Sequence, residues 1–415
     1  MRAAAVAVAA TPAVMTLTRE SPPAILAVVL AFLLAAVFAG GAGERLAGRL
    51  RAAAGSGPIL VLGVALLWLV ASIAWTPVPG RGATHALHMV GGAVAVTVLF
   101  AAARESAGHG RTAPGRPVPF GMLLAGGIAV ASVLVLVGVG PRGAIDGVSG
   151  LAAEGYRLNR AAVAIALLLP LALTLLWRGG RKPLAAALLP LAGAAILVSL
   201  SSSAKLALLI SALATPLALG RPLAAHRAFA VAAIGAVLVA PFVGPYVNDL
   251  LPRRIHEIGG YGSMTLRAEI WREYSLLLWE RPWFGFGVEA GYAVAGTPVA
   301  ASLGEWNRSL LNWGHPHNAA LQIWFELGAV GAALAAILLG LLFRALERLP
   351  PSILPAASVT ALAACAVAFV SHGAWQAWWY CLLGLIAVAF VFGHREDPAA
   401  ADRAPSGRGL RATPG

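Results

Sequence analysis

The residues best suited to chemistry lie just before a long apolar segment, in the run His315-Pro316-His317-Asn318. Proline is common at a helix start, and the first amides of the helix that follows attract anions. Histidine titrates close to neutral pH, so His317 is a candidate general base. The structural alternative is an interfacial histidine that hydrogen-bonds a loop carbonyl. Two histidines two positions apart do not define a metal site, and we expect no metal site and no cofactor.

Arg267 is the most informative cation in the sequence. None of the residues three or four positions away from it is acidic, so it lacks the helical partner that usually neutralises an arginine. We therefore favour a ligand-binding role for Arg267 over a distant structural partner. Arg272 has Glu269 three positions before it, and we expect those two side chains to form a structural ion pair.

Several other cations fall at the ends of apolar segments. Arg160 lies where a loop enters such a segment, and Lys205 follows three serines in a very short turn. Either side chain could instead extend to the lipid headgroups. Arg253 and Arg254 both have Glu257 within helical reach, so one of the two can stay free.

These residues must be positioned by helices in a membrane. Of the 415 residues, 59% are apolar and 11% are charged, whereas a soluble domain carries about 25% charged residues. The apolar residues form continuous runs of about the length that one spanning helix needs. The sequence therefore predicts an all-α polytopic membrane protein, and it excludes a water-soluble core, intrinsic disorder and a β-barrel. The two cysteines, Cys365 and Cys381, cannot form a disulfide framework or a four-ligand zinc site.

We predict about twelve transmembrane helices. Eleven spans cover residues 24–43, 58–75, 84–103, 119–140, 161–177, 183–200, 203–219, 227–244, 319–343, 352–371 and 375–392. Residues 3–17 are a candidate for the twelfth, with a cleaved signal peptide as the alternative. With both termini in the cytoplasm, the inner segments hold 18 of the 30 Lys and Arg residues but only six of the 17 Asp and Glu residues. The net charge of +13 is thus a topology signal, and no nucleic-acid binding is expected.

The spans divide the chain into four parts. Residues 1–244 and 317–393 hold the transmembrane helices, residues 245–316 form one large outer loop, and residues 394–415 are predicted to be a disordered cytoplasmic tail. A loop of that length is usually functional. Within it, residues 264–281 are predicted to form an amphipathic helix, and the aromatic residues around it suit a layer lying against the outer leaflet.

Almost no ionisable residue falls inside a predicted span; Glu326 and His372 come nearest. A coupled transporter usually places carboxylates or histidines along a pathway at the centre of the membrane. In this sequence the candidate cations gather instead at the outer ends of the helices. This distribution favours a reaction at the outer membrane face over transport through the membrane.

Two stretches resemble motifs of the O-antigen ligase and polymerase superfamily. Residues 317–318 (His-Asn), then nine residues, then 328–331 (Gly-Ala-Val-Gly) are similar to the His-[Asn/Ser/Gln]-x9-Gly-x-x-Gly pattern of bacterial O-antigen ligases. Arg267 and Trp271, followed by residues 281–287 (Arg-Pro-Trp-Phe-Gly-Phe-Gly), resemble the R…W…P..G.G stretch of the superfamily.

Two further positions agree with the resemblance, which covers roughly residues 150–345. Residues 158–162 (Leu-Asn-Arg-Ala-Ala) look like the superfamily's loop-to-helix junction, and residues 203–205 (Ser-Ala-Lys) stand where a Ser-Arg pair is common. Taken alone, Gly328 and Gly331 indicate only that small residues let transmembrane helices approach closely.

The resemblance implies a GT-C-type integral membrane glycosyltransferase. O-antigen ligases transfer a completed glycan from undecaprenyl pyrophosphate to lipid A–core at the periplasmic face of the bacterial inner membrane, without metal and with inversion of the anomeric centre. The match makes His317 the expected base and Arg267 an essential ligand of the donor pyrophosphate. The further ligands of pyrophosphate or glycan that we expect are Arg160, Lys205, Arg253, Arg254, Arg281, His315 and Asn318.

Three alternatives to the ligase stay open. An O-antigen or exopolysaccharide polymerase of the same superfamily would use a lipid-linked glycan as acceptor. A protein O-oligosaccharyltransferase would use a protein. A transporter or lipid flippase would show paired intramembrane charges and repeat symmetry, and the sequence shows neither.

Overall fold

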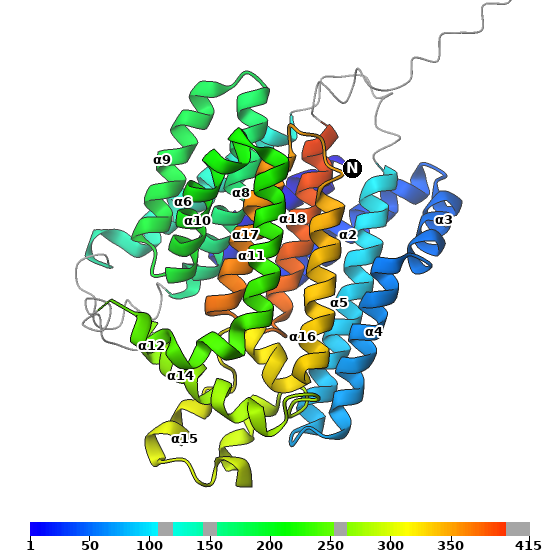
Figure 1. Ribbon diagram of the computed structural model, residues 1–415. Coiled ribbons are helices and arrows are strands. Elements are labelled where there is room, and N and C mark those ends of the chain that lie inside the picture. The colour runs from blue at the N-terminus through cyan, green and yellow to red at the C-terminus, as the bar shows by residue number, and fades with distance from the viewer. Residues whose placement is uncertain (107–118, 144–155, 253–263, 396–415) are drawn as a thin grey trace, which may run out of the picture.

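The structure, a computed structural model, describes residues 1–106, 119–143, 156–252 and 264–395. Every regular element in these ranges is a helix, and most of the helices run side by side in one bundle (Figure 1). Ten of the described helices are long and apolar enough to cross a membrane. The prediction of an all-α polytopic membrane protein is confirmed.

The ten long helices follow the predicted spans closely. They are α2 (Pro22–Ala39), α4 (Gly57–Ala71) continued by η1 (Ser72–Ala74), α5 (Pro79–Ser106), α6 (Phe120–Gly143), α8 (Asn159–Arg178) preceded by η3 (Tyr156–Leu158), α10 (Ser202–Gly220), α11 (Pro222–Val243), α16 (Ala319–Leu346), α17 (Leu354–Ser371) and α18 (Ala377–Arg395).

Two apolar helices are shorter, α1 (Arg2–Leu17) and α9 (Lys182–Val198). They correspond to the candidate span at 3–17 and to the predicted span at 183–200. At about 1.5 Å per residue, neither helix reaches the roughly 30 Å of a hydrocarbon core. Both still pack in the bundle, α1 against α6, α2 and α8, and α9 against α8 and α6.

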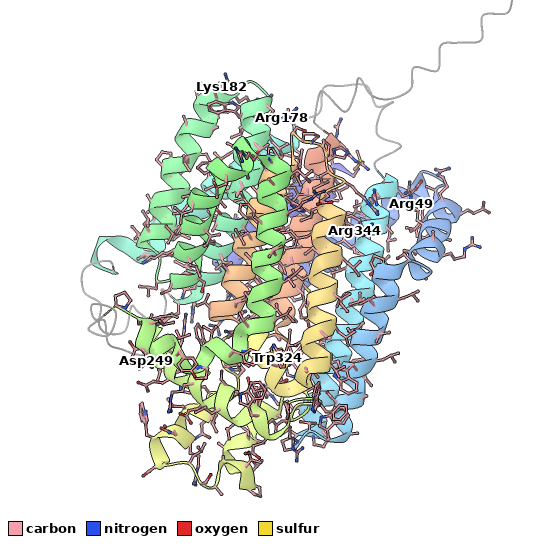
Figure 2. All side chains as sticks on the ribbon, viewed as in Figure 1. Arg49, Arg178, Lys182, Asp249, Trp324 and Arg344 are labelled. Atoms are coloured by element: carbon pink, nitrogen blue, oxygen red, sulfur yellow. The ribbon has the colours of Figure 1, made fainter. Side chains whose placement is uncertain are left out.

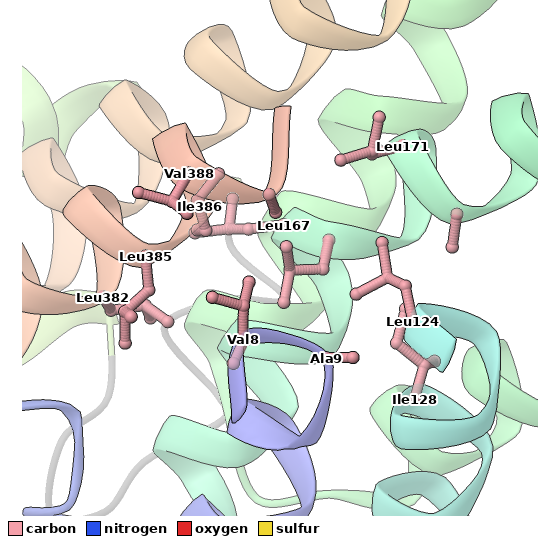
Figure 3. Close-up of a cluster of buried hydrophobic side chains, with 14 of the residues drawn as sticks. Val8, Ala9, Leu124, Ile128, Leu167, Leu171, Leu382, Leu385, Ile386 and Val388 are labelled. Carbon is pink, nitrogen blue, oxygen red and sulfur yellow. The ribbon is translucent and has the colours of Figure 1, made fainter. Parts of the chain in front are cut away.

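The helix α8 forms the centre of the bundle. Its residues 161–169 are all buried, as is typical of a helix that is apolar all round and enclosed by other helices. Figure 3 shows Leu167 of α8 in one cluster with Val8 of α1, Leu124 of α6 and Leu385 of α18. Because α8 is held on every side, its first residues are fixed at one end of the bundle.

A short helix, α3 (Gly43–Ala54), lies in a stretch that we expected to be only a loop between spans. Its Arg45 and Arg49 share one face because they are four residues apart, and both bind Glu105 at the end of α5, at 2.7 Å and 2.5 Å. Arg49, Arg178, Lys182 and Arg344 lie toward one end of the bundle, and Asp249 lies toward the other (Figure 2). These four cations belong to the segments that the charge count assigns to the cytoplasmic side.

The large loop folds against the end of the bundle away from these cations (Figure 1). It contains η4 (Gly244–Tyr246), α12 (Val247–Leu250), α14 (Met264–Leu277), η5 (Leu278–Glu280), η6 (Ala290–Tyr292), η7 (Val294–Gly296), η8 (Pro298–Ala300) and α15 (Glu305–Leu311). The predicted helix at 264–281 is thus α14 and η5. The expectation of aromatic residues facing the lipid is wrong for Trp271 and Tyr274, because both are buried against Phe325 of α16 and its neighbours.

A kink in α16 joins the loop to the bundle. Gly328 has φ 65° and ψ −165°, a conformation that only glycine adopts readily. The backbone of the loop takes the place of the missing helical bonds: the amides of Phe286 and Gly287 donate to the carbonyls of Phe325 and Glu326, at 2.9 Å and 2.8 Å. The interpretation of Gly328 as a small residue for helix contact is therefore incomplete, since this glycine makes room for a loop.

Candidate active site

The run of two histidines forms a tight turn in front of α16. Asn318 caps the helix, since its Oδ1 accepts a hydrogen bond from the amide of Leu321 at 3.0 Å. The backbone of His317 has φ 53°, which is uncommon outside glycine, and its amide donates to Nδ1 of His315 at 3.1 Å. The helix begins at Ala319 rather than at Pro316. Asn318 and His315 thus hold the turn that presents His317.

Arg267 lies beside the same turn. Its Nη1 donates to the carbonyl oxygen of Val370 at 3.2 Å, and the imidazole of His317 hydrogen-bonds the backbone of the next residue, Ser371. Neither contact is a carboxylate, so the expectation that Arg267 lacks an acidic partner agrees with the described residues. Burial lowers the pKa of the Arg267 guanidinium, which means that its charge is poorly hydrated and would gain from an anionic ligand.

The two imidazoles are neutral at neutral pH. Burial first, and then the positive field of Arg267, lowers the pKa of His317 to about 4 against the opposing hydrogen bond to Ser371. Burial and the neighbouring His317 lower the pKa of His315 to about 3, with a further contribution from Arg81. The two rings lie 4.3 Å apart between centroids. A neutral imidazole keeps a lone pair that can take a proton from a hydroxyl group.

Arg160, at the start of α8, has partners that the sequence did not reveal. Its Nη1 lies 2.6 Å from Oε2 of Glu20, in the connection between α1 and α2. The guanidinium also stacks over Trp378 of α18 at 4.4 Å from the ring centroid. Arg160 is therefore fixed by the connection between α1 and α2 and by α18 rather than free, and it presents its charge at the end of the bundle that carries His317.

Arg160, Arg267, His315 and His317 form a cluster with a fifth residue, His372. His372 is missing from the set of ligands that the sequence predicts. His372 directly follows α17, and it interacts electrostatically with the Arg160 and Arg267 guanidinium groups and with the titrating imidazoles of His315 and His317. Burial first, and then these interactions, lower the pKa of His372 to about 3. The only signal in the sequence is that His372 stands directly after the predicted span at 352–371.

Arg272 corrects one prediction. Its guanidinium pairs with Glu273 at 2.9 Å and not with Glu269. The carboxylate of Glu269 instead accepts a hydrogen bond from Nε1 of Trp306 at 3.2 Å, so α15 engages it. Arg272 is still in a structural pair, as expected, but with the adjacent residue.

The structure shows one of the predicted ligands, Arg281, away from the cluster and does not describe two others. Arg281 is exposed over the ring of Phe286 at 5.3 Å, in a cavity of about 630 Å³ that Trp68 and Trp75 also line. No contact recorded for the described residues joins Arg281 to His317. Arg253 and Arg254 lie outside the described residues.

Lys205 is an exposed residue in the first turn of α10. Two positions before it, the hydroxyl of Ser203 contacts that of Ser371. This contact places the start of α10 at the end of α17, next to the residue whose backbone binds His317. Lys205 thus lies near the cluster without a recorded partner among the described residues.

A second polar cluster, which the sequence did not predict, joins α5, the large loop and α16. Arg81 of α5 binds Glu289 of the loop at 2.5 Å and stacks over Tyr292 at 3.4 Å. The backbone amide of Glu289 donates to Oε2 of Glu326 at 2.6 Å, and Nε1 of Trp375 donates to the same oxygen at 2.6 Å. The carboxylate of Glu326 is therefore occupied by structural hydrogen bonds.

No group of three or more His, Cys, Asp or Glu side chains in the described ranges is arranged to hold a metal ion. The cluster around His317 instead combines fixed guanidinium groups with neutral imidazoles. Such a combination can bind a phosphate group and remove a proton beside it.

A family model described as O-antigen ligase matches residues 128–336, half of the chain. The chain belongs to the O-antigen ligase family. A comparison with curated proteins gives no match. Membership indicates a membrane glycosyltransferase that acts on a lipid-linked glycan and a lipid acceptor. The region matched by the O-antigen ligase model runs from α6 to the middle of α16, so it includes Arg160, Arg267 and His317, whereas His372 lies beyond it.

Proposed function

We propose that the protein is an O-antigen ligase with a GT-C-like fold that transfers a glycan from undecaprenyl pyrophosphate to lipid A–core. The observation that carries the proposal is the pairing of Arg267 and His317 at consecutive backbone positions, Val370 and Ser371, at the end of α17. There, a guanidinium that meets no carboxylate of the described residues stands next to a neutral imidazole. The first suits the leaving group of the reaction, and the second suits its nucleophile.

The chemistry needs one base and one anion site. The acceptor hydroxyl oxygen attacks the anomeric carbon, the bond from that carbon to the phosphate oxygen breaks, and its electron pair leaves with the pyrophosphate. The configuration inverts in a single displacement. Arg267 stabilises the charge that develops on the leaving group, in the role that a divalent cation fills elsewhere. His317 takes the proton of the hydroxyl group.

Donor binding would also activate the base. In the free protein the charge of Arg267 is one reason why the pKa of His317 is only about 4. A pyrophosphate bound to Arg267 would offset that charge and raise the pKa of His317 toward its ordinary value. The base would thus become strong only when the donor is in place.

The location of the site follows from charge. By the positive-inside rule, Arg49, Arg178, Lys182 and Arg344 belong to the cytoplasmic side. These four residues lie at the end of the bundle opposite the large loop (Figure 2). We propose that the protein spans the bacterial inner membrane and that His317 faces the periplasm. The polyprenyl tail of the donor would then stay in the bilayer while its pyrophosphate meets Arg267.

A reconstituted transfer assay tests this function. Purified protein in lipid nanodiscs is given a glycan on undecaprenyl pyrophosphate, with either lipid A–core or a second lipid-linked glycan as acceptor, in the presence of a chelator. We expect glycan on lipid A–core from the wild type. His317→Ala and Arg267→Ala should give none, whereas Arg308→Ala, which removes an exposed arginine of the same loop, should be active.

Each other outcome has a meaning. Glycan added only to the second lipid-linked glycan would make the protein a polymerase of the same superfamily. Full transfer by both His317→Ala and Arg267→Ala would remove these residues from the mechanism. No transfer by the wild type to either acceptor would overturn the proposed function and favour a protein acceptor or transport.

A further inference from the structure

His372 is held firmly where α17 ends and α18 is about to begin. Its ring lies against Trp378 at 4.8 Å and Trp379 at 4.9 Å between centroids. The next residue, Gly373, lies close to His315, because a Cβ at Gly373 would be 3.4 Å from Cδ2 of His315. The two tryptophans therefore fix the His372 imidazole at the edge of the site built around His317.

One ring nitrogen of His372 has no partner among the residues that the structure describes. Its Nε2 is buried and makes no hydrogen bond with any of them. A buried polar atom without a partner is costly and rare in folded proteins. The two tryptophans that lie against the ring give this nitrogen no hydrogen bond, and Nε1 of Trp378 donates to Gln376 instead. A group that binds at the site can satisfy this nitrogen.

The surroundings of His372 select an anion as that group. The guanidinium groups of Arg160 and Arg267 and the imidazoles of His315 and His317 act on it. Arg267 donates to Val370 and Arg160 donates to Glu20, so neither recorded bond reaches Nε2 of His372. A neutral ring in this positive field can supply an N–H group without adding another positive charge.

We propose that Nε2 of His372 carries a proton and donates a hydrogen bond to a phosphate oxygen of the donor lipid pyrophosphate. His372 is then a further binding residue of the leaving group, beside Arg267. The proposal rests on the proposed function, because that function supplies the pyrophosphate. It adds a neutral hydrogen-bond donor from the connection between α17 and α18, which lies outside the region that the family model matches.

Two substitutions separate binding from folding. His372→Leu keeps an apolar side chain between Trp378 and Trp379 and removes the unpartnered nitrogen, so the protein should fold at least as stably. His372→Gln places an amide N–H close to the position of Nε2. A merely structural role would make both variants equal to the wild type in ligand affinity once both are folded.

The test measures binding of undecaprenyl pyrophosphate, undecaprenyl phosphate and undecaprenol to purified protein in nanodiscs, with donor KM and kcat from the transfer assay. We expect His372→Leu to weaken undecaprenyl pyrophosphate binding by roughly tenfold or more. Its donor KM should rise more than its kcat falls. His372→Gln should recover most of the affinity, and undecaprenol binding should not change.

The possible failures are distinguishable. Equal affinity of the wild type and His372→Leu for undecaprenyl pyrophosphate would overturn the role of His372 and leave the proposed function intact. An equal loss of undecaprenol affinity would also overturn it, because the effect would then concern shape rather than charge. A wild type that neither binds undecaprenyl pyrophosphate nor transfers glycan would overturn the proposed function and this inference together.

Discussion

Nε1 of Trp271 donates a hydrogen bond to the carbonyl oxygen of Pro316, at 2.7 Å. Trp271 lies one turn after Arg267 on α14, and Pro316 lies between the two histidines. A single helix therefore carries the expected pyrophosphate ligand and also holds the turn that presents the expected base. The relative position of Arg267 and His317 depends on this bond as well as on the end of α17.

Replacement of Trp271 by phenylalanine should loosen that turn. Trp271→Phe keeps most of the buried ring but leaves the Pro316 carbonyl without its donor, which typically costs about 1–3 kcal/mol. We expect kcat/KM for glycan transfer to fall by roughly tenfold or more. Trp306→Phe is the matched control, since Trp306 is exposed and its Nε1 donates to the half-buried Glu269. Equal activities of the two variants would show that the turn does not depend on Trp271.

The dependence of transfer on pH should report His317. Because the pKa of His317 is about 4 in the free protein, its imidazole is neutral above that pH and can accept a proton. We expect kcat/KM to stay level from pH 8 to about pH 5.5 and to fall toward pH 4. The acid limb of kcat should lie at higher pH, because the bound pyrophosphate offsets the charge of Arg267. Coincident limbs would contradict this activation by the donor.

Substitution of Arg267 should separate charge from geometry. Arg267→Lys keeps a cation but cannot bind phosphate in a bidentate manner, so transfer should fall by roughly 100-fold. Arg267→Gln removes the positive field that lowers the pKa of His317, so the acid limb of its residual kcat/KM should move to higher pH. An unshifted limb in Arg267→Gln would mean that Arg267 does not act on the base.

The sequence was sufficient for the parts of the site that short motifs encode. The pairing of Arg267 with His317 was expected because each stands in a recognisable pattern and neither has a local acidic partner. His372 could not be found in this way, since its relation to Arg160 exists only because α17 ends and α18 begins beside the start of α8. Arg81 and Glu289 were missed for the same reason: their partnership depends on how the loop folds back onto α5.

The fold shows a similar division. Hydrophobic runs were enough to predict the helices, because a spanning segment must satisfy its own backbone. The contents of the large loop were harder to predict, since Trp271 looks equally suited to a lipid surface and to a small protein core. Nothing in the spacing of Gly328 distinguishes a helix contact from a left-handed backbone, and Glu326 gives no sign in the sequence of the donors that surround it.

The kink in α16 should tolerate only glycine at residue 328. Alanine there must adopt φ 65°, and its Cβ would lie 2.3 Å from the carbonyl carbon of Trp283, which is backbone and cannot move aside. We expect Gly328→Ala to destabilise the protein by about 3 kcal/mol or more and to reduce transfer, because the loop that carries Arg267 is attached at this point.

The matched control lies in the same helix. Gly340→Ala adds a Cβ at 3.6 Å from Cδ1 of Ile234, an ordinary contact, and alanine favours a helix over glycine by up to about 1 kcal/mol. Its thermal unfolding temperature should equal or exceed that of the wild type, measured in the same detergent. Gly328→Ala could instead unfold at the same temperature as Gly340→Ala and transfer glycan normally. In that case the loop does not need the kink, and the hydrogen bonds between residues 282–287 and α16 do not position the active site.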